Sequence, residues 1–207
     1  MSKTIALDFY LDASCRWSWW ASIWLRRVAR ERPIAITWKI FSLAVQDNPE
    51  DYSTGRTHHV RDFDLHRALF AARQADGNAA LERLYTVYGN VIHAENGHIR
   101  DAAVQAECLS AAGLPPDLFE QAQLDPSTEA GVIAETRAAL SMGAVGTPLL
   151  VLAASDACLF GPVLGAVPSG AEALALWDVV HFGLQHPYLY ELKRNRDRGT
   201  PAGTRAD

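Results

Sequence analysis

The chain has 207 residues, 49% of them hydrophobic and 21% charged, and its formal net charge is −5. This length and composition suffice for one full hydrophobic core with an inserted subdomain, and the negative charge gives no electrostatic reason to expect nucleic acid. No apolar stretch approaches the ~20 residues that cross a bilayer, and the first residues lack the pattern of a signal peptide. The cysteines are too few and too scattered for a disulfide framework, so we expect a cytosolic protein with reduced thiols.

The chain begins with a strand, a helix and a second strand. Ile5–Leu11 is an apolar run typical of a buried strand. After the turn Asp12–Ser14 a helix is predicted to about Glu31, where Pro33 follows. Ile34–Leu43 alternates apolar with polar residues and predicts a second strand. At this spacing the three elements form a parallel βαβ unit.

The first helix carries two sets of residues at helical spacing. One set predicts an apolar face and consists of Trp17, Trp20, Trp24 and Val28. The second set shares another face and consists of Cys15, Ser18, Ser22 and Arg26. Ser14, directly before the helix, is a residue type that caps helix N-termini.

From Gln46 to about Asp125 the pattern changes to helices. Three are predicted, over residues 61–76, 79–93 and 101–112. A further helix is predicted from Asp125-Pro126 to Met142-Gly143, because proline is favoured in a first turn. The chain then predicts strands over residues 149–153 and 158–160 and a last helix over residues 169–184.

Without the helical block, the order is strand, helix, strand, followed by helix, strand, strand, helix. This is the order of the thioredoxin fold, in which the two adjacent strands form an antiparallel hairpin. We therefore predict an α/β, thioredoxin-like fold with an all-helical insertion. Residues 1–45 and 126–190 would form the thioredoxin-like domain, residues 46–125 the helical insertion, and residues 191–207 a C-terminal tail.

Cys15 lies where the first predicted strand leads into the first helix, and this is the strongest functional signal in the chain. The thiolate is the nucleophile, and a free cysteine, with a pKa of about 8.5, is mostly protonated at neutral pH. The unpaired N–H groups and positive dipole of a helix N-terminus favour the anion. Ser18, one turn along, is placed to hydrogen-bond the sulfur, and Arg16 adds a nearby positive charge. These features predict a reactive thiolate; the alternative is an ordinary buried cysteine.

Thr147-Pro148, before the third predicted strand, strengthens this interpretation. In a thioredoxin-like fold the proline at this place is usually cis and faces the thiol, although only about 5–6% of X-Pro bonds are cis. We expect the Thr147 backbone to be exposed there, so that an incoming thiol compound can lie against it. Trp17, with site residues on both sides, is expected to form a platform beside the thiol.

The remaining candidate residues give weaker signals. Cys108 lies in a helical apolar pattern and Cys158 in the predicted hairpin, so both are expected to serve packing. The adjacent pair His58-His59 is expected to be solvated. His93 and His98 have no partners at metal-ligand spacing, so no metal site is predicted.

A series of short motifs, in a specific order, covers residues 4 to 196. They are Asp8-Phe9, Cys15-x-Trp17, Ser42-Leu43-Ala44, Leu84-Tyr85-Thr86, Gly89-Asn90, Ile92-His93, Gly146-Thr147-Pro148, Phe160-Gly161-Pro162-Val163-Leu164, Leu176-Trp177-Asp178 and Glu191-Leu192-Lys193-Arg194. In these motifs the chain resembles the DsbA-like family of the actinobacterial mycothiol-dependent nitroreductase. The resemblance implies a cytosolic protein with mycothiol as its low-molecular-weight thiol partner, and it suggests a homodimer.

The chain departs from this family at the thiol motif. The nitroreductase carries Cys-Pro-Trp-Cys, whereas here Arg16 replaces the proline and Ser18 the resolving cysteine. The resemblance assigns the nucleophile's role to Cys15, the motif tryptophan's to Trp17 and the cis-proline's to Thr147-Pro148. The resolving role has no occupant, so an internal disulfide cycle is not expected.

These observations predict a monothiol oxidoreductase in which Cys15 forms mixed disulfides, or reduces small substrates, with mycothiol as co-substrate and no tightly bound cofactor. Ser18 would tune the thiolate, while Arg16, Trp17, Thr147 and Pro148 would bind the thiol compound. One alternative is a transferase or isomerase of the kappa-class glutathione transferase or 2-hydroxychromene-2-carboxylate isomerase type, which holds the thiol of a bound cofactor. Another alternative is a thiol-binding module without turnover.

Overall fold

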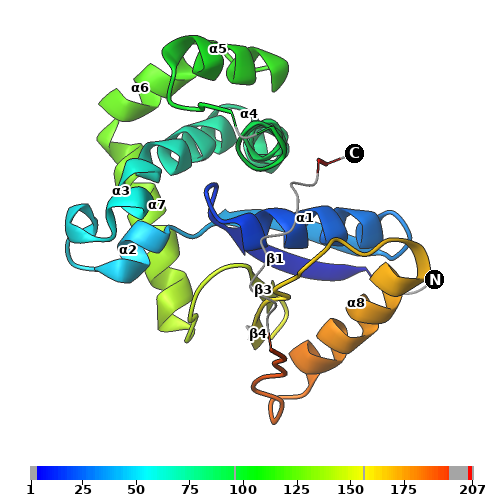
Figure 1. The fold of residues 1–207 in the computed structure, drawn as a ribbon. Coiled ribbons are helices and arrows are strands. Elements are labelled where there is room, and N and C mark those ends of the chain that lie inside the picture. The colour runs from blue at the N-terminus through cyan, green and yellow to red at the C-terminus, as the bar shows by residue number, and fades with distance from the viewer. Residues whose placement is uncertain (1–3, 96, 156, 196–204, 207) are drawn as a thin grey trace.

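A four-stranded sheet forms the centre of the computed structural model, which describes residues 4–95, 97–155, 157–195 and 205–206. The strand order is β2-β1-β3-β4 (Figure 1). The strands are β1 (Ile5–Leu11), β2 (Ile34–Ile40), β3 (Leu149–Leu152) and β4 (Ala157–Phe160). β1 and β2 are parallel, β3 is antiparallel to β1, and β3 and β4 form an antiparallel hairpin. The predicted βαβ unit and closing hairpin are thus confirmed.

Helix α1 (Arg16–Ala29) is buried on nearly all sides. Its buried residues are Ser18, Trp19, Trp20, Ala21, Ser22, Ile23, Trp24, Leu25 and Val28. Trp24 donates its indole N–H to Ala173 in α8 (Gly170–Gln185) at 3.0 Å, and the Trp19 ring meets Tyr85 in α4 (Phe63–Gly89) edge-on at 5.6 Å. Trp20, Trp24 and Val28 of the predicted apolar face are thus buried as expected, and other helices also cover the face that carries Ser18 and Ser22.

Helices fill the chain between β2 and β3, and most of them lie over one end and one side of the sheet (Figure 1). Besides α4 they are α2 (Leu43–Asp47), the 3-10 turn η1 (Tyr52–Thr54), α3 (Thr57–Arg61), the π turn η2 (Asn90–Ala94), α5 (Ala102–Ala111), α6 (Leu118–Leu124) and α7 (Pro126–Ser141). The boundaries of the insertion, at residues 46 and 125, stay a prediction.

The bounds of some elements agree with the sequence expectation and those of others differ from it. β2 ends at Ile40 rather than residue 43, because the side chain of Ser42 accepts the N–H of Val45 and starts α2. The break predicted between the helices over 61–76 and 79–93 is confirmed, because α4 has a non-helical backbone at Asp76 and Gly77 and is kinked there. Gly77 has φ of 71°, a left-handed conformation that glycine adopts at little cost. The short helices α2, α3 and α6 were not predicted.

The kink places Asn78 against the edge strand β2. The Asn78 side chain accepts the N–H of Trp38 at 2.8 Å and donates to the carbonyl of the same residue at 2.7 Å. A sheet edge otherwise leaves such backbone groups unpaired. This double hydrogen bond attaches α4 to the sheet.

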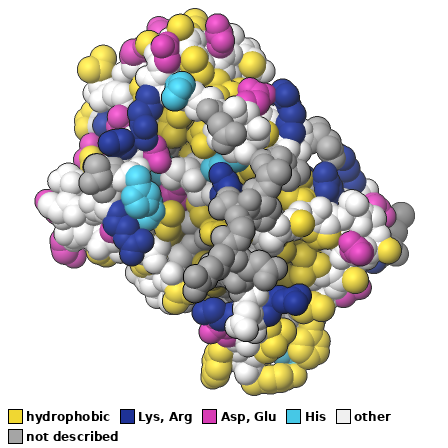
Figure 2. Space-filling model, in the orientation of Figure 1, with side chains coloured by type: hydrophobic (Ala, Val, Ile, Leu, Met, Phe, Trp, Pro, Cys, Tyr) yellow, Lys and Arg dark blue, Asp and Glu magenta, His cyan; other side chains and the backbone are white. Residues whose placement is uncertain are grey.

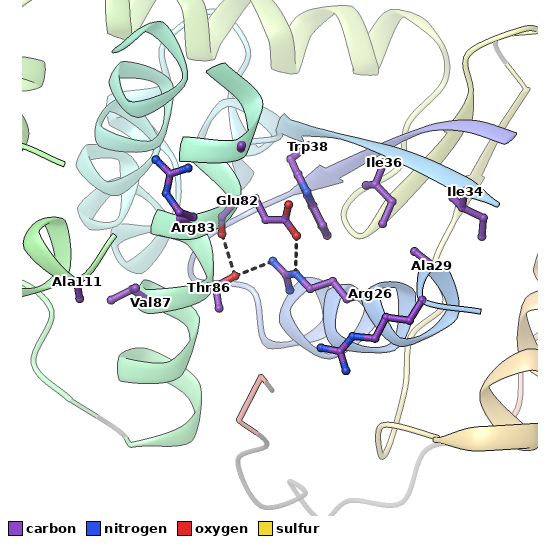
Figure 3. Close-up of a pocket in the computed structure, with 12 residues that line it drawn as sticks. Arg26, Ala29, Ile34, Ile36, Trp38, Glu82, Arg83, Thr86, Val87 and Ala111 are labelled. Carbon is purple, nitrogen blue, oxygen red and sulfur yellow. Dashed lines mark hydrogen bonds and ion pairs between the residues drawn. The ribbon is translucent and has the colours of Figure 1, made fainter. Parts of the chain in front are cut away.

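Arg26 joins α1 to α4 at a groove (Figure 3). Its Nε donates to Glu82 Oε1 and its Nη2 to Thr86 Oγ1, both at 3.0 Å, and its guanidinium lies 4.4 Å from the centroid of the Trp38 ring. The groove has a volume of about 820 Å³ and is lined by residues of α1, β2, α4 and α5. Cys15 does not line it, so the groove is separate from the thiol.

The C-terminal part of the described chain exposes several apolar side chains. Val179 and Phe182 on α8 are 51% and 47% exposed, and Tyr188 beyond it is 69% exposed. Figure 2 shows apolar side chains gathered at the lower end of the molecule, where Figure 1 places the end of α8. Of the predicted tail, residues 196–204 and 207 lie outside the described residues.

Candidate active site

Cys15 is the N-cap residue of α1 and follows β1 by one short turn. It is half-buried, its backbone is extended (φ −80°, ψ 110°), and its carbonyl accepts the N–H of Trp19 at 3.0 Å to open the helix. The expected placement at a strand-to-helix junction is thus confirmed. The expectation that Ser14 caps the helix was wrong, because its hydroxyl donates to Asp12 Oδ1 at 2.7 Å.

Three of the predicted site residues converge at the start of α1. The Cys15 thiol lies 3.8 Å from the Thr147 carbonyl oxygen, to which it donates, and Ser18 Oγ lies 2.8 Å from Thr147 Oγ1. The Thr147–Pro148 peptide bond is cis, and so is Gly161–Pro162, which was not predicted. Residues distant in the sequence therefore form one cluster. The expectation that Thr147 is exposed was wrong, because the residue is buried and its carbonyl faces the Cys15 thiol.

The hydroxyl protons of this cluster have a fixed direction. Thr147 Oγ1 donates to the carbonyl oxygen of Tyr10 at 2.8 Å, because a carbonyl can only accept. A hydroxyl has one proton, so Ser18 must donate to Thr147 Oγ1. In the free protein the Ser18 hydroxyl therefore donates its proton to Thr147 and not to the Cys15 sulfur.

Burial raises the pKa of the Cys15 thiol, and the negative charge of Asp12 raises it further. The Ser18 hydroxyl, once it turns from Thr147 to the sulfur, and the N–H groups of Ser18 and Trp17 act in the opposite direction but do not outweigh burial. The expectation of a thiolate at neutral pH was thus wrong for the free protein. The N–H groups at the helix N-terminus stabilise the thiolate, but burial removes water that would stabilise it more strongly.

Asp12 is a buried carboxylate directly beneath this turn, with an exposed fraction of 1%. Its Oδ1 accepts the N–H and hydroxyl of Ser14, and its Oδ2 accepts the N–H of Leu43. Burial alone would raise its pKa. The facing His66 and these hydrogen bonds nevertheless hold the pKa of Asp12 well below its usual range, so it stays ionised.

Two buried histidines from the helices over the sheet hydrogen-bond to the backbone of the neighbouring residue Ala13. Its N–H points to Nε2 of His66 at 3.2 Å, and its carbonyl faces Nε2 of His93 at 3.1 Å. Burial lowers the pKa of His93 to about 4, so this ring is neutral at pH 7 and its Nε2–H donates to the carbonyl.

Sequence reasoning gave no site role to Asp12, His66 or His93. A signal for His66 exists, because it lies between Leu65 and Leu69 on the apolar face of the predicted helix, where a polar residue needs a partner. The identity of that partner depends on the fold.

The structure leaves other predicted roles open. Trp17 is half-buried, and its ring packs edge-on against Trp20 at 5.8 Å. Arg16 is half-buried and contributes to the lowered pKa of His93. Whether Trp17 forms a platform and Arg16 binds the thiol compound stays a prediction.

The other two cysteines serve packing, as predicted. Cys108 is 3% exposed in the main core, and burial raises its pKa to about 11. Cys158 is half-buried against a smaller apolar cluster. Within the described ranges, no three His, Cys, Asp or Glu side chains are grouped as a metal site would require. No helix of those ranges is long and apolar enough to span a bilayer.

A family model described as the mycothiol-dependent nitroreductase Rv2466c matches residues 14–194, a stretch that includes the thiol turn, α1 and the cis-proline. The chain belongs to this family. A relative in sequence, the uncharacterized protein Rv2286c of Mycobacterium tuberculosis, is 32% identical over 192 residues, which cover 91% of this chain and 81% of the relative. The resemblance seen in the sequence motifs is thus confirmed.

Solved structures show the same fold for this family member. A probable DsbA oxidoreductase from Streptomyces coelicolor, SCO1869, has a TM-score of 0.64 at 17% identity and covers 97% of this chain and 98% of its own. A 2-hydroxychromene-2-carboxylate isomerase has a TM-score of 0.62 at 15% identity over 87% and 96%. The cytosolic disulfide reductase DsbM from Pseudomonas aeruginosa has a TM-score of 0.58 at 15% identity over 86% and 99%. The α/β, DsbA-like thioredoxin fold is therefore confirmed.

Proposed function

We propose that this protein is a monothiol oxidoreductase in which Cys15 exchanges disulfides with mycothiol or reduces small substrates at its expense. The observation that carries the proposal is the cluster of Cys15, Ser18 and Thr147 at the start of α1. It occurs in a chain of the mycothiol-dependent nitroreductase family. Ser18 occupies the place of a resolving cysteine, so the second thiol must come from outside the protein.

The exchange balances without a second protein cysteine. The Cys15 thiolate attacks one sulfur of a disulfide, a Cys15–sulfur bond forms, the disulfide bond breaks, and one thiolate leaves. An external thiolate then attacks the partner sulfur of this mixed disulfide, and Cys15 leaves as a thiolate. The electron pair passes from the incoming thiol to the original disulfide, and the protein returns unchanged.

The raised pKa of Cys15 is compatible with this chemistry. A smaller fraction of thiolate is present at neutral pH, but a thiolate of higher pKa is the stronger nucleophile. Ionisation also frees the Thr147 carbonyl, which accepts the thiol proton in the free protein. That carbonyl then becomes an acceptor for the backbone or amide of the docking thiol compound. Trp17, Arg16 and Pro148 would border the same compound.

The thiol partner would be mycothiol, as the family description implies, and the reaction would take place in the cytosol. The cytosolic disulfide reductase DsbM, which has the same fold, supports that setting. A homodimer, which the family resemblance suggests, would be tested by sedimentation equilibrium.

Mass spectrometry after incubation with mycothiol disulfide tests the proposal. We expect one mycothiol adduct on Cys15, retained in Cys108→Ser and Cys158→Ser and lost in Cys15→Ser. The burial and the raised pKa of Cys108 make it the least reactive control. An adduct on Cys108 or Cys158 with Cys15 unmodified would reject the proposal.

The same raised pKa favours a second candidate, in which the site holds the thiol of a bound cofactor and Cys15 stays protonated. The protein would then be a thiol-dependent transferase or isomerase, or a thiol-binding module without turnover. Cys15→Ser separates the candidates, because disulfide exchange should vanish whereas mycothiol conjugation or 2-hydroxychromene-2-carboxylate isomerisation should persist. Calorimetric binding of mycothiol with neither adduct nor turnover would identify the module.

A further inference from the structure

His66 is a fully buried residue of α4 whose Nε2 faces two different groups. The N–H of Ala13 and the Oδ2 of Asp12 both lie 3.2 Å away. A backbone N–H can only donate a hydrogen bond, and an ionised carboxylate oxygen can only accept one. His66 therefore accepts a hydrogen bond from Ala13 when Nε2 carries no proton, and donates one to Asp12 when Nε2 carries a proton.

The two states differ in the charge that surrounds the thiol. A proton on Nε2 points an N–H of the ring at the buried Asp12 carboxylate and offsets its charge. With Nε2 bare, the carboxylate charge is uncompensated at that side. Asp12 acts directly on Cys15, since its carbonyl accepts the Cys15 N–H at 3.1 Å and its charge opposes the thiolate.

Other ionisable or charged groups that interact with this turn or with His66 are Arg16, Asp64, Tyr85 and His93. Asp64 is on the same helix as His66 and is exposed, so water screens it. His93 is neutral at pH 7, and burial raises the pKa of Tyr85, so neither carries charge there. The Arg16 guanidinium keeps its charge throughout. Among these groups, the contact of His66 with Asp12 therefore decides how much of the Asp12 charge acts on the thiol.

We propose that His66 is a positioning residue of the thiol site, whose Nε2 proton favours the Cys15 thiolate by offsetting Asp12. The coupling is reciprocal, because each charge stabilises the other by the same free energy.

The inference deepens the proposed function, since it concerns the same thiol, but its test uses a small thiol reagent instead of mycothiol. The test is the rate of Cys15 alkylation by iodoacetamide against pH, in a Cys108→Ser/Cys158→Ser background. Asp12→Asn keeps the acceptor of Ser14 and removes the charge, so the rate at neutral pH should rise about tenfold. His66→Gln keeps a neutral donor near the Nε2 position, so the rate should fall about three- to tenfold.

The double variant Asp12→Asn/His66→Gln should behave as Asp12→Asn, because His66 then has no carboxylate to offset. The matched control is His59→Gln, which alters a half-buried histidine paired with Asp47 at 2.7 Å and should leave the rate unchanged. Equal profiles for His66→Gln and the control, or full additivity in the double variant, would overturn the inference.

Failure of mycothiol exchange alone would leave the alkylation test intact, so the two proposals fail separately.

Discussion

Ser18 Oγ lies 2.8 Å from Thr147 Oγ1, and the single proton of Ser18 is committed to that contact because the Thr147 hydroxyl donates to Tyr10. Ser18 can therefore hydrogen-bond a Cys15 thiolate only by leaving Thr147. The hydroxyl in the resolving position has two competing acceptors, and this competition leads to two predictions of opposite sign.

Removal of the Ser18 hydroxyl should lower the stability of the fold and the fraction of Cys15 that is ionised. Ser18→Ala deletes a buried hydrogen bond worth about 1 kcal/mol and takes away the hydroxyl that lowers the pKa of Cys15. We expect a loss of unfolding free energy of about 1 to 2 kcal/mol and slower alkylation of Cys15 at neutral pH. Urea unfolding and iodoacetamide kinetics measure the two effects.

Ser22→Ala is the matched control for this variant. Ser22 is equally buried one turn further along α1, where it donates to Trp19 and accepts from Arg26. Its loss should lower stability by a similar amount without changing the alkylation rate of Cys15. Equal alkylation rates in Ser18→Ala and the parent would contradict the assigned role of Ser18.

Removal of the competing acceptor should have the opposite effect on the thiol. Thr147→Val keeps the shape of the side chain but frees the Ser18 proton for the sulfur. We expect faster alkylation of Cys15 at neutral pH, together with a stability loss of about 1 to 3 kcal/mol from the lost bond to Tyr10. An alkylation rate below that of the parent protein would show that Ser18 does not turn to the sulfur.

A restored cysteine in place of Ser18 should change the type of chemistry. Ser18→Cys recreates a two-cysteine motif at the start of α1, and the two thiols can then close an internal disulfide. We expect mixed disulfides on Cys15 to become transient, since the introduced thiol resolves them. Intact mass spectrometry after treatment with mycothiol disulfide should show the loss of two hydrogens in place of an adduct. A persistent adduct in this variant would mean that burial of the introduced side chain prevents the second attack.

The site could be located from the sequence, but its electrostatics could not. The position of Cys15 follows from local periodicity, because an apolar run precedes it and a helical pattern follows it. The sign of its pKa shift depends on burial by helices distant in the chain and on the charge of Asp12. The partner of Asp12 is His66, which no local pattern connects to it. The hydrogen bond of Ser18 to Thr147 could not be predicted either, because the two residues are far apart in the chain. The parallel βαβ unit and the antiparallel hairpin, in contrast, follow from the order of the elements.

Stability in mild acid should depend on His93. Burial holds its pKa at about 4, below the unfolded value of 6.5, so the unfolded chain binds a proton first as the pH falls. The stability that this ring contributes is present above pH 6.5 and is lost progressively toward pH 4, by about 3 kcal/mol in all.

His93→Gln keeps a donor for the Ala13 carbonyl but cannot bind that proton. We therefore expect the difference in unfolding free energy between parent and variant to shrink as the pH falls from 6.5 to 4. The carboxylates titrate in both proteins, so their contribution cancels in the difference. His98→Gln, at an exposed histidine, should follow the parent at every pH. Parallel plots of unfolding free energy against pH for the parent and His93→Gln would contradict the prediction. They would mean that the His93 ring is solvated and that its 3.1 Å contact with the Ala13 carbonyl does not persist.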